Sequence, residues 1–236
     1  MTPGSTLQWR SALLEGFAVL VGILLAFSID AWWDLRSQRL EGRSYLAAMR
    51  TELIANQSLV EEDLDSLRRW VDESRGFLET VVAPGAQPSY DEVSRMVWLT
   101  GPYRTHPLPR AALDDLISSG GFQSIENAEL RRALASYQRA LERDALEQED
   151  VRDLFQQFVQ LYHIEEGSFT EFPWEPYAEV PESAVTFRLP VEAFASNRVY
   201  ANILIVRILD YSNLRESHRE VLRQIDGSLQ LMGSAA

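Results

Sequence analysis

The chain has 236 residues, 46% of them hydrophobic, which is enough for one sizeable core or two small ones and too apolar for a disordered chain. Its 22 basic and 35 acidic residues give a net charge of -13, which argues against nucleic acid as a partner because that backbone requires a basic face. The chain has no Cys, which excludes disulfides, thiolate metal sites and cysteine nucleophiles.

The most apolar part of the sequence lies near its N-terminus. Residues 13–33 carry only two charged side chains, Glu15 and Asp30, both near the ends of the segment. A helix of this length measures roughly 30 Å, about the thickness of the hydrocarbon core of a bilayer. We therefore predict a single transmembrane helix, with residues 1–35 forming an N-terminal tail and membrane anchor.

Three tryptophans flank this apolar segment. Trp9 precedes it, and Trp32 and Trp33 end it, as expected for indole rings that act as anchors at the two membrane interfaces. A cleavable signal peptide is the alternative, but it would have a more basic start and small residues at its cleavage site. The flank AWWDLRSQR is instead bulky and charged, which favours an uncleaved anchor.

One face of the predicted membrane helix carries small residues at every fourth position, with an acidic residue near each end. Small residues let two helices approach closely in lipid, so this face predicts contact with another membrane helix. Alternatively, small residues are simply common in such helices, and the two acids reach the interfaces. The predicted contact face consists of Glu15, Ala18, Gly22, Ala26 and Asp30.

Residues 36–236 predict a helical soluble domain. The first helix continues out of the membrane as an amphipathic helix until the segment VVAPGAQP at 81–88 ends it. Short helices are expected at about 91–99 and 110–118, the second closed by Gly120–Gly121. Two further long helices follow, with apolar stripes of Leu130, Leu134, Tyr137, Leu141, Val151, Phe155, Phe158 and Tyr162, and of Leu204, Ile208, Tyr211, His218, Leu222, Ile225 and Leu229.

The expected fold is therefore all-α. One N-terminal transmembrane helix continues into an antiparallel helical bundle, because long helices joined by short connections pack antiparallel in turn. An irregular insert at about 167–192 interrupts the bundle, since it is rich in Pro and aromatic residues and cannot be a helix. A short strand at 183–189 has no evident partner, so a sheet is not expected.

The irregular insert contains the best candidate for a partner-binding loop. Phe172, Trp174 and Tyr177 alternate with prolines in FPWEPY, and aromatic anchors in a pre-ordered loop suit a docking site. The alternative is that this loop folds back and caps one end of the bundle.

Two sequence blocks resemble an uncharacterised bacterial family of single-pass membrane proteins. The first block runs from Glu15 through the aliphatic stretch to Gly22-Ile23-Leu24-Leu25-Ala26-Phe27, Ile29-Asp30 and Trp32. The second is LDDLISSGGFQSIENAELRRALASY at 113–137. The family is a domain of unknown function, so the resemblance implies an anchored helical protein but transfers no catalytic residue. It also implies the bacterial inner membrane, with the C-terminal domain in the periplasm.

The distribution of arginines points the other way. Only Arg10 precedes the predicted anchor, whereas Arg36, Arg39, Arg43 and Arg50 follow it. The positive-inside rule would place the larger, C-terminal part in the cytoplasm. We favour the periplasmic side because of the family resemblance.

No pattern of residues predicts an active site, a cofactor or a metal. The three histidines, His106, His163 and His218, lack the helical spacing of metal ligands, and His218 fits a hydrogen-bonded position at the core edge. The acidic clusters around Glu61 and Glu147 are expected to be solvated helix faces. No nucleophile, zinc, phosphate or dinucleotide motif is present, so we do not expect an enzyme.

The sequence favours a membrane-anchored helical interaction or scaffold protein. Such a protein would be an accessory subunit of a respiratory, photosynthetic or transport complex. Its expected partners are the lipid bilayer and either other membrane subunits or a second copy of itself. The alternative is a periplasmic sensor or ligand-binding module tethered to the inner membrane, although the short N-terminal tail offers no output domain.

Overall fold

The computed structural model describes residues 5–100, 106–167 and 188–234. Within these ranges, the side chains of residues 5–16, 18, 19, 31, 34, 35, 38, 39, 100 and 234 are outside the description. The described residues are almost entirely helical and include no strand, which confirms the all-α expectation. The α-helices are α1 (Ser5–Phe77), α2 (Tyr90–Thr100), α3 (Ala111–Ser118), α4 (Ala128–Leu154), α5 (Gln160–Glu166), α6 (Val191–Phe194) and α7 (Arg198–Ser234).

The helix ends follow the local signals in the sequence. A π-helical turn, η1 (Leu78–Val82), prolongs α1 up to the expected break at Pro84. Gly120 has a positive φ of 72°, a conformation that suits glycine, and it ends the turn after α3. The Asn197 side chain accepts hydrogen bonds from the backbone N–H groups of Val199 and Tyr200, which caps the start of α7.

The chain divides into two compact units. Unit 1 combines Met1–Arg50 with Ala111–Ala128. Here α1 passes close to the 3-10 turn η2 (Gly121–Ser124). A Cβ atom built on Gly42 would lie only 3.1 Å from Ser124 Oγ. Leu113 and Leu116 of α3 are fully buried.

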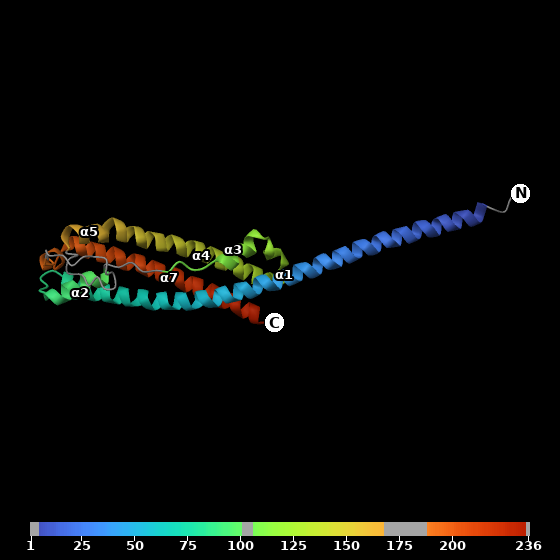
Figure 1. The fold of residues 1–236 in the computed structure, drawn as a ribbon. Coiled ribbons are helices and arrows are strands. Elements are labelled where there is room, and N and C mark those ends of the chain that lie inside the picture. Colours follow the sequence, from blue (N-terminus) through green and yellow to red (C-terminus); the bar gives the residue numbers. More distant parts are fainter. Residues whose placement is uncertain (1–4, 101–105, 168–187, 235–236) are drawn as a thin grey trace. The chain divides into compact units, whose positions relative to one another are not determined.

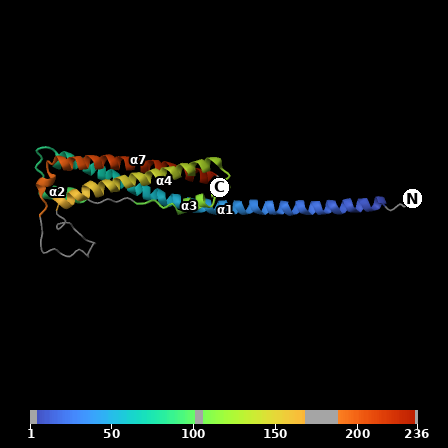
Figure 2. The same ribbon diagram turned by 90° about the horizontal axis from the view of Figure 1, so that it is seen from above.

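Unit 2 comprises Thr51–Arg110 and Glu129–Ala236, and three long helices run side by side in it. They are the C-terminal part of α1, α4 and α7, shown in two views in Figures 1 and 2. The expectation of consecutive antiparallel helices is only half right. Going from Asn56 to Asp63 along α1, the nearby residues of α4 have increasing residue numbers. Asn56 donates a hydrogen bond to Tyr137, and Asp63 contacts the same histidine, His218, as Asp144. These two helices are therefore parallel.

Along α1, the contacting residues of α7 have decreasing residue numbers. Gln57 donates a hydrogen bond to Asp226, and the Trp70 ring lies 5.4 Å from that of Tyr211, so α7 is antiparallel to α1. The parallel pair is possible because the chain returns along α1 before α4 begins. His106 contacts Asp63 and Pro109 contacts Asn56, so the extended segment 106–110 runs back against the direction of α1.

The core of unit 2 uses most of the predicted apolar stripes. Leu130, Leu134 and Tyr137 are buried as expected, whereas Phe158 is 55% exposed. The reason is the π-helical segment η3 (Phe155–Val159), which adds a residue to one turn and rotates the following face. Val159 thereby takes the inward position and is 1% exposed.

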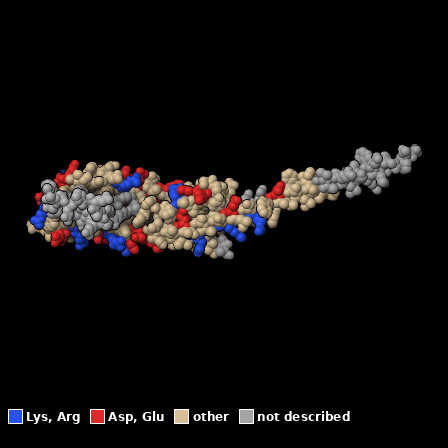
Figure 3. Space-filling view, viewed as in Figure 1, with Lys and Arg blue, Asp and Glu red and all other residues tan. Residues whose placement is uncertain are grey.

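Across the part of the chain that the structure describes, no helix combines the length and the apolar character needed to cross a membrane. The transmembrane helix that the sequence predicts is therefore not confirmed. In Figure 3, residues other than Lys, Arg, Asp and Glu cover most of the described N-terminal half of α1, whereas charged side chains of both signs lie over unit 2.

Candidate functional site

The predicted contact face of the first helix is only partly within the description. Gly22, Ala26 and Asp30 are exposed on α1, whereas the side chains of Glu15 and Ala18 lie outside the described set. A Cβ atom built on Gly22 would meet nothing within 4 Å. There is therefore room on this face for a neighbouring helix or for a larger side chain.

The predicted interface anchors at the end of the apolar segment are exposed. Trp32 and Trp33 are 58% and 64% exposed, with ring centroids 6.5 Å apart, and the Arg36 guanidinium lies over the Trp32 ring at 5.7 Å. The side chain of Trp9 is outside the described residues, as are Phe172, Trp174 and Tyr177 of the candidate partner-binding loop.

A buried charged cluster joins the three long helices of unit 2. His218 of α7 is completely buried, and its Nδ1 atom lies 2.7 Å from Asp144 Oδ1 of α4. Its Nε2 atom lies 3.4 Å from Asp63 Oδ2 of α1. Asp63 and Asp144 are 3% and 1% exposed. One imidazole thus bridges two buried carboxylates from different helices.

The cluster holds a positive charge on the imidazole. Burial by itself would lower the pKa of His218, but the hydrogen bonds to Asp144 and Asp63, together with their negative charges, raise this pKa to about 9. Burial would likewise raise the pKa of Asp63, but hydrogen bonds from His218 and His106 lower it below its usual range. At neutral pH, an imidazolium ion therefore donates to two carboxylates.

Asp63 also fastens the return segment 106–110 to α1. The Nδ1 atom of His106 lies 2.8 Å from Asp63 Oδ1, and its backbone N–H donates to Asp63 Oδ2 at 3.3 Å. A second tie lies near the end of the segment, where the Asn56 amide donates to the Pro109 carbonyl at 2.6 Å. These two ties hold the segment in place along α1.

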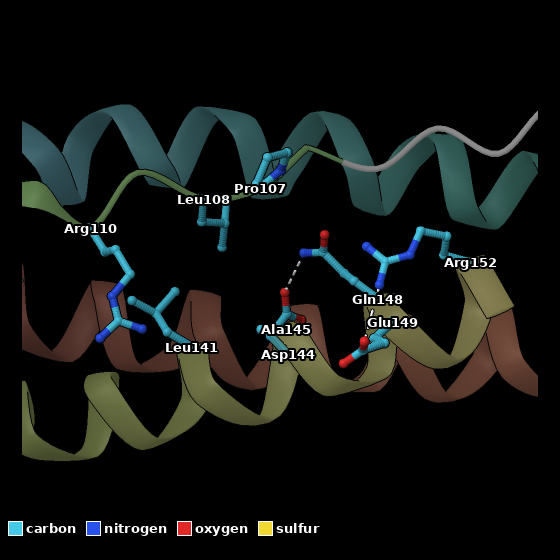
Figure 4. Close-up of a pocket in the computed structure, with 9 residues that line it drawn as sticks. All are labelled: Pro107, Leu108, Arg110, Leu141, Asp144, Ala145, Gln148, Glu149 and Arg152. Carbon is cyan, nitrogen blue, oxygen red and sulfur yellow. Dashed lines mark hydrogen bonds and ion pairs between the residues drawn. The ribbon is translucent and has the colours of Figure 1, made fainter.

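The return segment and α4 line a cavity of about 410 Å³ that is open to solvent on one side. Figure 4 shows Arg110 at one end, Arg152 at the other, and Asp144 with Gln148 between them. Asp144 therefore belongs both to the charged cluster and to the cavity wall. Its Oδ1 atom contacts His218, and its Oδ2 atom accepts a hydrogen bond of 2.8 Å from the Gln148 amide. The lining residues are Pro107, Leu108, Arg110, Leu141, Asp144, Ala145, Gln148, Glu149 and Arg152.

A second histidine lies in an aromatic cluster in unit 2. His163 of α5 is 2% exposed, and its Nε2 atom lies 3.2 Å from the Tyr200 hydroxyl. Its ring is also 5.9 Å from that of Phe194. Burial, with a smaller effect from the charge of Arg207, lowers the pKa of His163 to about 4, so this imidazole is neutral at pH 7.

These histidines do not form a metal centre. Among the residues that the structure describes, no group of three metal-ligating side chains is placed to hold an ion. Both nitrogens of His218 face carboxylate oxygens, so the protonated ring has no lone pair to offer a cation. A fully buried ring with both nitrogens engaged is also poorly placed to exchange protons with a substrate. The cluster instead ties three helices together.

Sequence reasoning missed the two carboxylates of this cluster. Asp63 belongs to an acidic run expected to be solvated, and Glu61, Glu62 and Asp65 are indeed exposed, but Asp63 is buried. Its position between Val60 and Leu67 on the apolar stripe was the available signal, since residues three or four apart share a helix face. The prediction that His218 is hydrogen-bonded within the stripe of the last helix is confirmed, although His218 is fully buried and does not lie at the core edge.

Comparisons with known protein families, with curated proteins and with solved structures found no match to the chain. The resemblance to the bacterial membrane family stays a prediction.

Proposed function

We propose that the chain is a membrane-anchored helical interaction protein, an accessory subunit that stabilises a larger inner-membrane complex. The observation that supports the proposal is the exposure of apolar side chains on α1. Ile23, Leu24 and Leu25 are 52%, 57% and 57% exposed, and Phe17 and Phe27 are 66% and 69% exposed. Lipid or a partner helix would cover such a surface.

The exposure extends around the whole helix. Successive residues of an α-helix point about 100° apart, so three consecutive exposed residues, Ile23 to Leu25, face different sides. A helix that is apolar on all sides is typically buried in lipid or in a large protein core, whereas an amphipathic surface helix is apolar on one side. Water contact with each large side chain costs about 1.5–3 kcal/mol relative to burial.

The partner of the anchor would lie against the small residues. Gly22 and Ala26 allow close approach of a second helix, and packing rather than hydrophobic burial drives association in lipid. Respiratory, photosynthetic and transport complexes, or a second copy of the chain, all offer such a helix. The charged side chains on the surface of unit 2 are compatible with exposure of this unit to water.

Gly22→Leu tests the interaction. The larger side chain should separate the helix backbones, so the variant should lose its co-purifying subunits, or its self-association, while it remains in the membrane. Leu24→Ala, on the opposite side of α1, is the control and should retain the partners. If Gly22→Leu changes neither the co-purifying proteins nor the oligomer size, the proposed contact face is wrong.

We further propose that the helical domain lies on the periplasmic side, as the family resemblance implies. An enzyme that folds only after export, fused after Ala236, should then be active. Activity of a reporter that works only in the cytoplasm would reverse the orientation, in agreement with the arginine distribution.

The alternative of a tethered ligand-binding module has one observation in its favour. The cavity between residues 107–110 and α4 has a volume of about 410 Å³, within the range of small-molecule sites.

A further inference from the structure

The cavity in unit 2 combines an apolar wall with basic ends. Leu108 of the return segment and Leu141 of α4 both line it, and Ala145 extends the α4 side. The guanidinium groups of Arg110 and Arg152 lie at opposite ends (Figure 4). Guanidinium groups match the geometry of carboxylates, and the apolar stretch between them suits a hydrocarbon body.

The acidic side chains of the wall already have positive partners. Asp144 is paired with the buried imidazole of His218 at 2.7 Å, so the cavity does not present this carboxylate as an uncompensated charge. Glu149 is paired with Arg152 at 3.2 Å, and both side chains of this pair are about half exposed. An exposed ion pair of this kind is weak, so an incoming carboxylate can share or replace Glu149 on Arg152.

The wall opposite α4 is fixed before any ligand arrives. Hydrogen bonds from His106 to Asp63 and from Asn56 to Pro109 hold both ends of the segment that carries Leu108. Arg110 is the last residue of this segment, and its five N–H donors allow more than one partner at a time. Pre-organised groups lose less conformational freedom when a ligand binds.

From this arrangement we infer that the cavity is a binding site for a small organic carboxylate with an apolar body. A dicarboxylate would engage Arg110 and Arg152 together, whereas a monocarboxylate or an amino acid would engage one of them. This inference goes beyond the proposed role of the anchor and does not depend on it.

The test is calorimetric titration of the full chain in a mild detergent with glutarate, adipate, butyrate and L-leucine, and with the neutral analogue glutaramide. At least one acid should bind with a Kd below about 1 mM, and glutaramide should bind at least about tenfold more weakly than glutarate or not at all. The acid that binds best shows whether the ligand is a dicarboxylate, a monocarboxylate or an amino acid. A dicarboxylate preference indicates use of both arginines.

Variants locate the binding. Arg110→Gln or Arg152→Gln should raise the Kd of the acid that binds best by about tenfold or more, because a charge-assisted hydrogen bond is lost. Ala145→Trp fills the cavity without changing charge and should also abolish binding. Arg139→Gln is the matched control, since Arg139 is exposed on α4 and donates to Ser136 rather than lining the cavity.

The inference is overturned if no acid of the panel binds with a Kd below about 1 mM, or if glutarate binds below this value and glutaramide binds as tightly. It is also overturned if Ala145→Trp, or both arginine variants, bind as the unaltered chain does. None of these outcomes would affect the membrane anchor, which is tested separately.

Discussion

At the scale of single residues, two buried histidines differ in charge at neutral pH, because His218 is protonated and His163 is neutral. His218 lies between two carboxylates, which raise its pKa to about 9, whereas His163 lies among aromatic rings, and burial lowers its pKa to about 4. Both shifts are relative to the ordinary value near 6.5 of an unfolded chain. Each histidine therefore makes the stability of the fold depend on pH, in opposite directions.

The free energy of unfolding should be greatest near pH 6.5. Above this pH, folded His218 keeps a proton that the unfolded chain has lost, so its stabilising contribution declines up to about pH 9. Below it, the unfolded chain binds a proton that folded His163 does not accept until about pH 4, so stability declines as pH falls. Each decline should be on the order of 3 kcal/mol, measured by urea unfolding in mild detergent.

Two variants separate the declines. The triple variant Asp63→Asn, Asp144→Asn and His218→Gln keeps polar groups but removes the charges, and should flatten the alkaline decline alone. His163→Gln should flatten the acid decline alone. An alkaline decline that persists unchanged in the triple variant would show that His218 is not its source.

At the scale of elements, the sequence predicts which segments are helical better than how the helices are directed. Periodic apolar residues predict α1, and the prolines at 84 and 88 mark where it ends. The parallel direction of α4 depends on the return segment, which is held by Asp63 and Asn56. Those partners are distant in sequence, so local patterns carry no information about them.

The same limit explains two smaller differences. The π-helical turn η3 shifts the face of the helix after Phe155, and no apolar periodicity signals such a turn in advance. Asp63 is buried because His218, 155 residues further on, offers it a charge. Nothing local distinguishes it from its solvated neighbours except its place on the apolar stripe.

Two glycines of α1 should respond differently to the same change. Gly76→Ala meets nothing within 4 Å and should raise the free energy of unfolding by about 0.5–1 kcal/mol, since Ala favours helix over Gly. At Gly42, the new Cβ would lie 3.1 Å from Ser124 Oγ and 3.3 Å from its carbonyl oxygen, so Gly42→Ala should lose this gain. Gly42→Leu should be destabilising. Equal gains in both Ala variants would contradict the close approach of α1 to η2.

At the scale of the whole molecule, the two most distinctive features belong to different parts of the chain. The exposed apolar stretch lies on the N-terminal part of α1, and the charged cluster with its cavity lies in unit 2. The proposed anchor would serve the interaction with a complex, and the inferred carboxylate site would serve a separate response to a small molecule. The proposed interaction depends on the proposed membrane anchor.

Alkaline carbonate extraction of membranes that contain the full chain tests whether the proposed anchor is inserted. We expect the protein to stay in the membrane pellet, and the combined variant Ile23→Glu, Leu25→Glu and Phe27→Glu to be released. Each added charge opposes insertion by about 2.5–3.5 kcal/mol near a helix centre, so three should prevent it. Release of the unaltered chain into the supernatant would show that the apolar part of α1 is not a membrane anchor.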